Sequence, residues 1–159
     1  MIHIRKATEQ DVVAIHDLVR ELAIYEKAEH EVATSPEIYA RDGFGATPYF
    51  ECFVAEHAED GIVGISLFYF GYSTWKGKLL YLDDLVIRES HRRMGIGTML
   101  MKNLAKYAIE QQATMMKWQV LDWNEPAIEM YRQLGAVFDS EWVDCKMFHQ
   151  QLNDWVNEG

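Results

Sequence analysis

LLYLDDLVIRESHRRMGIGT, residues 79–98, is the stretch that decides the fold of this chain. Its first part, Leu79 to Ile87, is apolar apart from two acids and is typical of a buried strand. Its last part, Arg92 to Thr98, carries two arginines and two glycines, and an apolar stripe at helical spacing begins at Met99. A strand, a glycine turn and a helix in this order present free N–H groups and the positive end of the helix dipole to an anion. The stretch therefore predicts a phosphate-binding loop.

The glycine pattern has other interpretations, which the neighbouring residues help to weigh. It is not a Walker A loop, because no Gly-Lys-Ser/Thr follows, and Leu100 stands where a dinucleotide fingerprint needs its third glycine. A bare G-x-G is also typical of an ordinary tight turn, but the two arginines and the strand–turn–helix context favour an anion site. Residues 88–106 hold five basic residues and one acidic residue in a chain of net charge −10. This charge distribution alone fits an anion-binding site and a solvated basic helix face equally well.

Length and composition narrow the class of protein. The 159 residues, 49% hydrophobic, predict a single domain over 1–159 with a sizeable core. We expect no membrane segment, because no apolar run approaches about 20 residues, and no signal peptide, because no apolar stretch follows the first basic residues. The negative net charge argues against nucleic acid as a partner. Cys52 and Cys145 show no disulfide or zinc spacing, which indicates a cytoplasmic protein, and the six histidines show no paired spacing, so we expect no metal.

The remaining sequence predicts one mixed sheet with helices on its faces. Thr8 and Ser35 begin two helices, Glu59-Asp60-Gly61 indicates a hairpin turn, and residues 71–78 form a loop or second turn. A third helix follows Gly97, and a fourth runs from Asn124 to Leu134. The expected strands are residues 2–6, 50–56, 62–70, 79–87, 115–121, 136–138 and 142–148.

Arg92-x-x-Gly95-x-Gly97 resembles the acetyl-coenzyme A binding motif of the GNAT superfamily of N-acetyltransferases. The order of expected elements resembles that α/β fold, in which helices cover both faces of a mostly antiparallel sheet of about seven strands. Other runs are similar to the diamine acetyltransferase branch, which includes spermidine/spermine and thialysine acetyltransferases. These runs are Asp42-Gly43-Phe44-Gly45, Tyr69-Phe70, Trp75-x-Gly77-Lys78, Leu80-Tyr81-Leu82-x-Asp84 and Trp123-Asn124-Glu125-Pro126.

The resemblance implies acetyl-coenzyme A as co-substrate and assigns three groups of contacts to it. Backbone groups of Leu85, Val86 and Ile87 would bind pantetheine, a role compatible with their pattern as buried sheet. The pyrophosphate would lie on the glycine loop, and a third group would line the far side of the cofactor channel. The loop residues are Arg92, Arg93, Met94, Gly95, Ile96, Gly97 and Thr98, and the far-side residues are Asn124, Glu125, Pro126 and Ala127.

The resemblance also implies catalytic and substrate-binding residues. By pattern Tyr131 is a helical core residue, whereas the matching tyrosine of the family is the general acid, which suits protonation of a departing thiolate. Asp83 matches the substrate carboxylate, although better-known members have glutamate there; strand alternation predicts that it and Asp84 face opposite sides. The other implied substrate contacts are Tyr25, Glu26 and Trp75.

We therefore predict an acetyl-coenzyme A dependent N-acetyltransferase for a small cationic primary amine such as a diamine, polyamine or thialysine-like compound. The amine attacks the thioester directly, so neither cysteine is needed as a nucleophile. Ser73-Thr74-Trp75 matches the thialysine type, since polyamine-specific members carry an acid at the position of Ser73. The alternatives are a protein or peptide N-acetyltransferase and a non-catalytic acyl-coenzyme A binding module. The resemblance further implies a homodimer that pairs through Trp142–Phe148.

Overall fold

The structure is a computed structural model that describes residues 1–158. The chain divides after Leu121 into two compact units, which are described separately. A single acetyltransferase domain over the whole chain stays a prediction.

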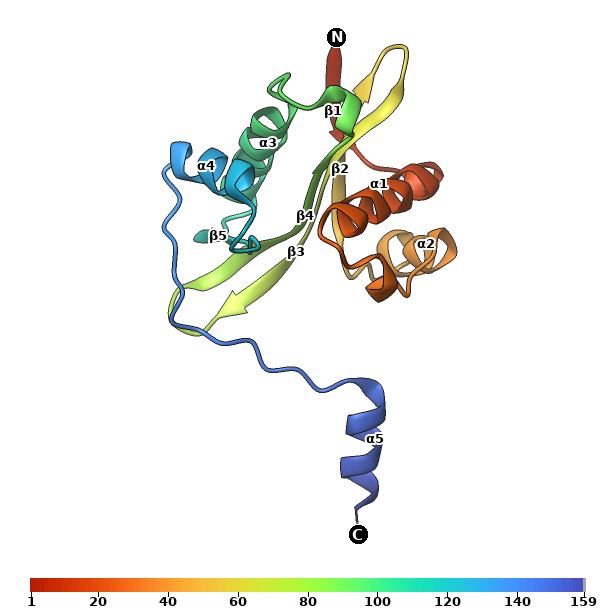
Figure 1. Cartoon of the computed structure of the whole chain (residues 1–159), viewed down its shortest axis with the longest axis vertical. Helices are drawn as coiled ribbons and strands as arrows, with labels where there is room; N and C mark the ends of the chain where they lie inside the picture. The colour runs from red at the N-terminus through yellow and green to blue at the C-terminus, as the bar shows by residue number, and fades with distance from the viewer. Residues whose placement is uncertain (159) are drawn as a thin grey trace. The chain divides into compact units, whose positions relative to one another are not determined.

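The first unit is built on one mixed sheet with the strand order β1-β2-β3-β4-β5 (Figure 1). Neighbouring strands from β1 to β4 are antiparallel, with β2, β3 and β4 joined by short turns and β1 joined to β2 through α1 and α2. β5 runs parallel to β4 after a helical crossover. The strands are β1 (Ile2–Lys6), β2 (Glu51–His57), β3 (Gly61–Ser73), β4 (Gly77–Ile87) and β5 (Met115–Lys117).

Helices cover both faces of this sheet: α1 and α2 lie on one side and α3 on the other (Figure 1). The start of α2 follows its sequence signal, because the Ser35 hydroxyl accepts a hydrogen bond from the Ile38 N–H at 3.2 Å and Pro36 takes the first position. The helices are α1 (Val12–Tyr25), α2 (Pro36–Phe44) and α3 (Ile96–Glu110), with the 3-10 turns η1 (Glu9–Asp11), η2 (Glu29–Glu31) and η3 (Glu89–His91).

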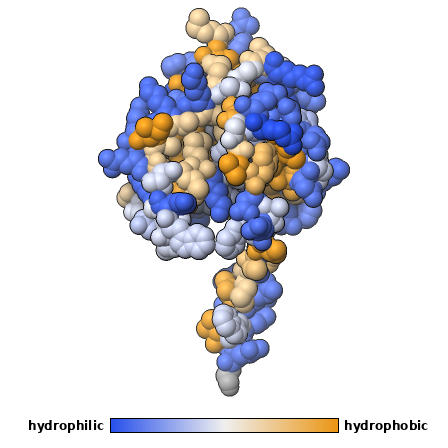
Figure 2. Space-filling view, turned by 90° about the vertical axis from the view of Figure 1, so that its left-hand side faces the viewer, coloured by the Kyte–Doolittle hydropathy of each residue, from blue (hydrophilic) through white to orange (hydrophobic). Residues whose placement is uncertain are grey.

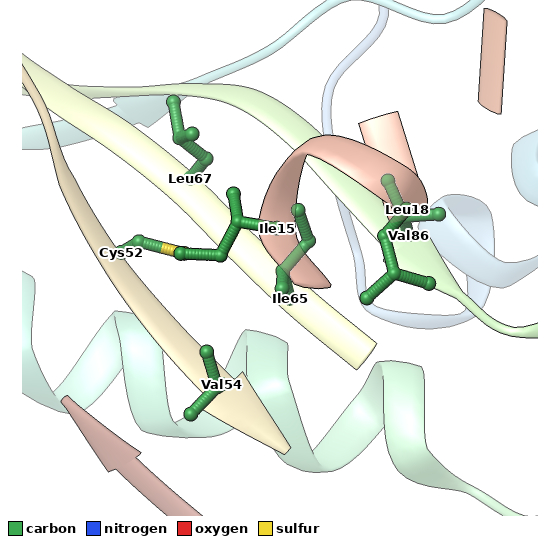
Figure 3. Packing of buried hydrophobic residues seen from close by; sticks show 7 residues of the cluster. All are labelled: Ile15, Leu18, Cys52, Val54, Ile65, Leu67 and Val86. Carbon is green, nitrogen blue, oxygen red and sulfur yellow. The ribbon is translucent and has the colours of Figure 1, made fainter. Parts of the chain in front are cut away.

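Each face of the sheet has its own apolar core. On the α1 side, Ile15 and Leu18 pack against Val54, Ile65 and other buried side chains of β2–β4 (Figure 3). On the α3 side, two fully buried residues of the helix, Ile96 and Leu100, pack against β2 and β3. The sheet is thus held rigid from both sides, which fixes the position of β4 and of the loop that follows it.

The second unit contains α4 (Glu125–Gln133) and α5 (His149–Asn157). The Asn124 side chain caps α4 by accepting from the Ala127 N–H at 3.4 Å, and Gly135 ends the helix region with a φ of 83°. Apolar side chains lie exposed along α5 (Figure 2), among them Trp155. No helix among residues 1–158 combines the length and the apolar character needed to cross a bilayer.

The α/β class and the mixed sheet are confirmed, but the expected strand count is not. The sheet has five strands instead of about seven, because residues 136–138 and 142–148 form no strand. A strand needs a neighbouring backbone to complete its hydrogen bonds, and these segments make no ladder within residues 1–158.

Two boundaries and one helix also differ from the sequence prediction. The last strand of the sheet stops at Lys117 instead of Leu121, and α5 was not expected. The loop expected over residues 71–78 is shorter, because Ser73 and Gly77 already pair across the hairpin.

Candidate active site

The glycine loop has the conformation that an anion-binding turn requires. Gly95 precedes α3 with a φ of 78°, a left-handed conformation that disfavours side chains with a Cβ. No heavy atom lies within 4 Å of the position that a Cβ would take there, so the space beside the backbone is open. No side chain caps the start of α3. The N–H groups of the first helical turn are therefore suited to a pyrophosphate.

The arginines of the loop are held at its entrance, and both are exposed. The Arg92 Nε donates a hydrogen bond to the Ile87 carbonyl at 3.2 Å, and its guanidinium lies 5.3 Å from the centre of the Tyr25 ring. Tyr25, expected to contact the substrate, thus lies beside a residue expected to contact the cofactor. Arg88 instead pairs with Glu21 at 2.8 Å. The basic segment therefore contains both an ion-paired arginine and exposed arginines at the loop.

The far end of β4 offers an edge for a second ligand. β4 pairs with β3 up to Ile87, but it pairs with β5 only over Leu79–Tyr81. Within residues 1–121, the outer edge of β4 from Leu82 to Ile87 has no strand partner. This edge includes Leu85, Val86 and Ile87, the residues expected to bind pantetheine through their backbone. An extended chain with amide groups can hydrogen-bond to such an edge in the manner of an added strand.

A β-bulge at Asp83 changes the expected direction of its side chain. Leu67 faces Asp84 across the ladder while the next residue, Phe68, faces Leu82, so Asp83 has no partner. The expectation that Asp83 and Asp84 lie on opposite faces assumed strict alternation, which the bulge interrupts. Burial and then the charges of both carboxylates raise the pKa of Tyr39 on α2. Strict alternation fails wherever two residues of one strand oppose a single residue of its neighbour.

Three carboxyl groups, those of Asp83, Asp84 and Glu26, interact electrostatically. Burial, followed by the charges of Asp83 and then Glu26, raises the pKa of Asp84 to about 7. Burial likewise raises the pKa of Asp83 and of Glu26, which follows the last residue of α1. A group of three carboxyl groups favours a cationic ligand, and Asp84 can take up a proton near neutral pH.

Trp75 lies far along the hairpin from these acids. It occupies the β3–β4 turn, where the Ser73 hydroxyl accepts hydrogen bonds from the N–H groups of Trp75 at 3.3 Å and Lys76 at 3.1 Å. Six residues of β4 separate the turn from Asp83, or about 20 Å at the rise of a strand. Within one chain, therefore, only a long substrate can contact both places.

The remaining expected site residues belong to the second unit. Tyr131 lies near the end of α4 and is buried, and Asn124 to Ala127 form the cap and first turn of that helix. Their roles toward the cofactor stay predictions. Sequence reasoning gave no role to Tyr39 or Tyr69, whose pKa values are raised by burial and by the acids. Tyr69 stood only within the Tyr69-Phe70 run, and no sequence signal identified Tyr39.

Comparison with known proteins shows the family and the fold to which the chain is similar. The chain is 41% identical over 156 residues to the Thialysine N-epsilon-acetyltransferase of Bos taurus, covering 92% of each protein. It is 34% identical over 140 residues to the human Spermidine/spermine N(1)-acetyltransferase-like protein 1, covering 84% of this chain and 20% of that protein. An integron cassette protein from the mobile metagenome of V. cholerae shares the fold, with a TM-score of 0.79 at 22% identity over 99% of this chain and 98% of that one.

The profile of the Acetyltransferase (GNAT) family matches residues 12–136, which include α1, the whole of β4, the glycine loop and α4. The chain therefore belongs to the GNAT family of acetyltransferases, and to its diamine acetyltransferase branch.

Proposed function

We propose that this protein transfers an acetyl group from acetyl-coenzyme A to a primary amine of a small molecule with a second cationic or polar group. The observation that carries the proposal is the group of three acids beside β4, with an Asp84 pKa of about 7. An ordinary aspartate, at pKa near 3.9, is a poor proton acceptor for an alkyl ammonium of pKa ~10.4. Asp84 is a better one while it remains anionic at neutral pH.

The co-substrate fits the residues at the end of β4. The first turn of α3 and the two loop arginines would hold its pyrophosphate, and the unpaired edge of β4 would hold its pantetheine arm. Bound there, it supplies the activated thioester. A rigid strand that leads directly into the loop would keep both contacts in register.

The chain's own residues would move two protons. Asp84, directly or through a water molecule, accepts a proton from the ammonium, and Asp83 with Glu26 holds the other cationic end of the substrate. The freed amine forms the C–N bond as the C–S bond breaks. Tyr131 donates its phenolic proton to the departing sulfur, and the proton released by the new amide nitrogen passes to solvent. No covalent intermediate on the enzyme is required.

The test is an acetylation assay with short diamines, thialysine, spermine and lysine-containing peptides, each with acetyl-coenzyme A. We expect the short diamines and thialysine to have the highest kcat/KM. A preference for peptides would support a protein acetyltransferase instead. Tight coenzyme A binding without turnover of any amine would indicate a binding module.

We also infer that the active form is a homodimer. Aromatic and aliphatic side chains of the C-terminal segment lie exposed, with Trp142 at 73% and Val143 at 84% of their full accessible area. Such a run favours coverage by a second copy of the chain. Light scattering at micromolar concentration should give twice the mass of 18.5 kDa, and a monomer mass would contradict this.

A further inference from the structure

Two histidines and an aspartate converge at the end of the sheet where the turn between β2 and β3 lies (Figure 1). His57 ends β2, Asp60 lies in the following turn, and His91 ends η3. One carboxylate oxygen of Asp60, Oδ2, lies 3.2 Å from Nδ1 of His57 and 3.0 Å from Nε2 of His91. The three potential ligand atoms all lie within 4.8 Å of one another.

The two separations from Asp60 suit a tetrahedral metal ion. Zinc bonds to nitrogen and oxygen of about 2.0–2.1 Å place neighbouring ligand atoms about 3.3 Å apart in a tetrahedron. Two imidazoles with one carboxylate favour zinc and similar transition metals over magnesium or calcium, which prefer oxygen ligands throughout. Three protein ligands would leave a fourth position for water.

The ring of His91 is already held in the orientation of a ligand. This side chain is buried, with 8% of the residue exposed, and its Nδ1 lies 2.9 Å from the Ser90 hydroxyl. Metal-binding histidines are typically oriented by such a hydrogen bond on the nitrogen that does not bind the ion. At His57, the N–H groups of Glu59 and Asp60 approach Nδ1 at 3.3 Å each, so an ion would replace two long hydrogen bonds.

We propose that His57, Asp60 and His91 form a binding site for one zinc ion or a similar divalent transition metal. The expectation of no metal rested on linear spacing, and the fold brings together histidines that are separated by the whole of β3 and β4. Because Arg92 of the glycine loop directly follows His91, the ion would fix the β2–β3 turn to the entrance of that loop. Its role would be structural and independent of the acetyl transfer.

The experiment measures binding of Zn²⁺ alone to the metal-stripped, tag-free full chain by titration calorimetry. We expect one ion per chain, and at least about tenfold weaker binding after His57→Gln or Asp60→Asn. Ser90→Ala, which removes the partner of His91, should weaken binding by about tenfold. His30→Gln is the matched control, because His30 also lies beside an acid, 3.4 Å from Glu31, without a second histidine; it should leave binding unchanged.

A second measurement needs no variant. One equivalent of Co²⁺ should produce the visible absorption bands of a tetrahedral site. Added Zn²⁺ should displace the Co²⁺ and remove these bands. Circular dichroism and coenzyme A affinity of each variant establish that it is folded. Absence of saturable Zn²⁺ binding, absence of the cobalt bands, or equal zinc affinity in the folded His57→Gln and Asp60→Asn variants would overturn the proposal and leave a hydrogen-bonded cluster.

Discussion

Replacing Asp84 with asparagine tests the proposed proton acceptor most directly. Asparagine has nearly the shape of a protonated aspartate, but it cannot take up a proton. A positioned general base contributes typically 10²–10⁴-fold, so Asp84→Asn should lower kcat/KM by about 100-fold or more. Wild-type kcat/KM should rise with pH through about 7, where Asp84 loses its proton. This rise, the acidic limb of the pH profile, should be absent from the variant.

The same substitution should stabilise the fold at alkaline pH. A carboxyl whose pKa rises from 3.8 to about 7 on folding opposes folding when ionised. The resulting loss in the free energy of unfolding is absent below pH 3.8 and complete above pH 7. At 1.36 kcal/mol per pKa unit its upper bound is about 4 kcal/mol. Because Asp84 keeps part of its contact with solvent, we expect a gain of about 1–2 kcal/mol at pH 8, or about 2–8 °C in Tm.

The assay is a pH series of kcat/KM with a short diamine, together with thermal unfolding at pH 4 and pH 8. Asp83→Asn is the matched control: it removes a like charge that raises the pKa of Asp84, so its activity limb should move to lower pH and persist. An Asp84→Asn variant that keeps the limb near pH 7, or that loses stability at pH 8, would refute the reasoning. A residue with a merely structural role would not give lower activity together with higher stability.

Three further predictions concern the cofactor loop, the general acid and the substrate. Gly97→Val should place a branched side chain in the first turn of α3 and weaken coenzyme A binding while the protein stays folded. An unchanged coenzyme A affinity by calorimetry would contradict the assignment of this loop to the cofactor. Tyr131→Phe should lower kcat by at least about tenfold while coenzyme A affinity barely changes, measured where chemistry limits the rate. Ser73→Asp can still accept the hydrogen bonds of the turn. It should raise kcat/KM for spermine relative to a short diamine by about tenfold or more, and an unaltered ranking would reject the Ser-Thr-Trp argument.

Local signals predicted most of the first unit, because its elements carry their own start and end residues. Ser35 caps its helix as expected, and the apolar run from Leu79 to Ile87 forms the expected strand. In the second unit, Asn124 likewise caps α4. The prediction of two C-terminal strands was wrong because alternation of apolar residues indicates an extended chain but does not supply the neighbouring strand with which it must pair. The cluster of His57, Asp60 and His91 could not be predicted, since its members meet only through the pairing of β2, β3 and the segment after β4.

The bulge at Asp83 shows why the site itself was only partly predictable. No glycine or proline marks it, and regular alternation would direct Asp83 toward the α3 side, away from Asp84. The extra residue interrupts this alternation while the rest of β4 keeps its pairing with β3, and the charges of both acids raise the pKa of Tyr39. In the proposed function one strand would serve two ligands: its acids would hold an amine, and its free edge and terminal loop would hold a long anionic thioester. An irregularity that concentrates like charges is unfavourable for folding, and strained or charged positions of this kind are typical of functional sites, as the proposed role of the acids in β4 requires.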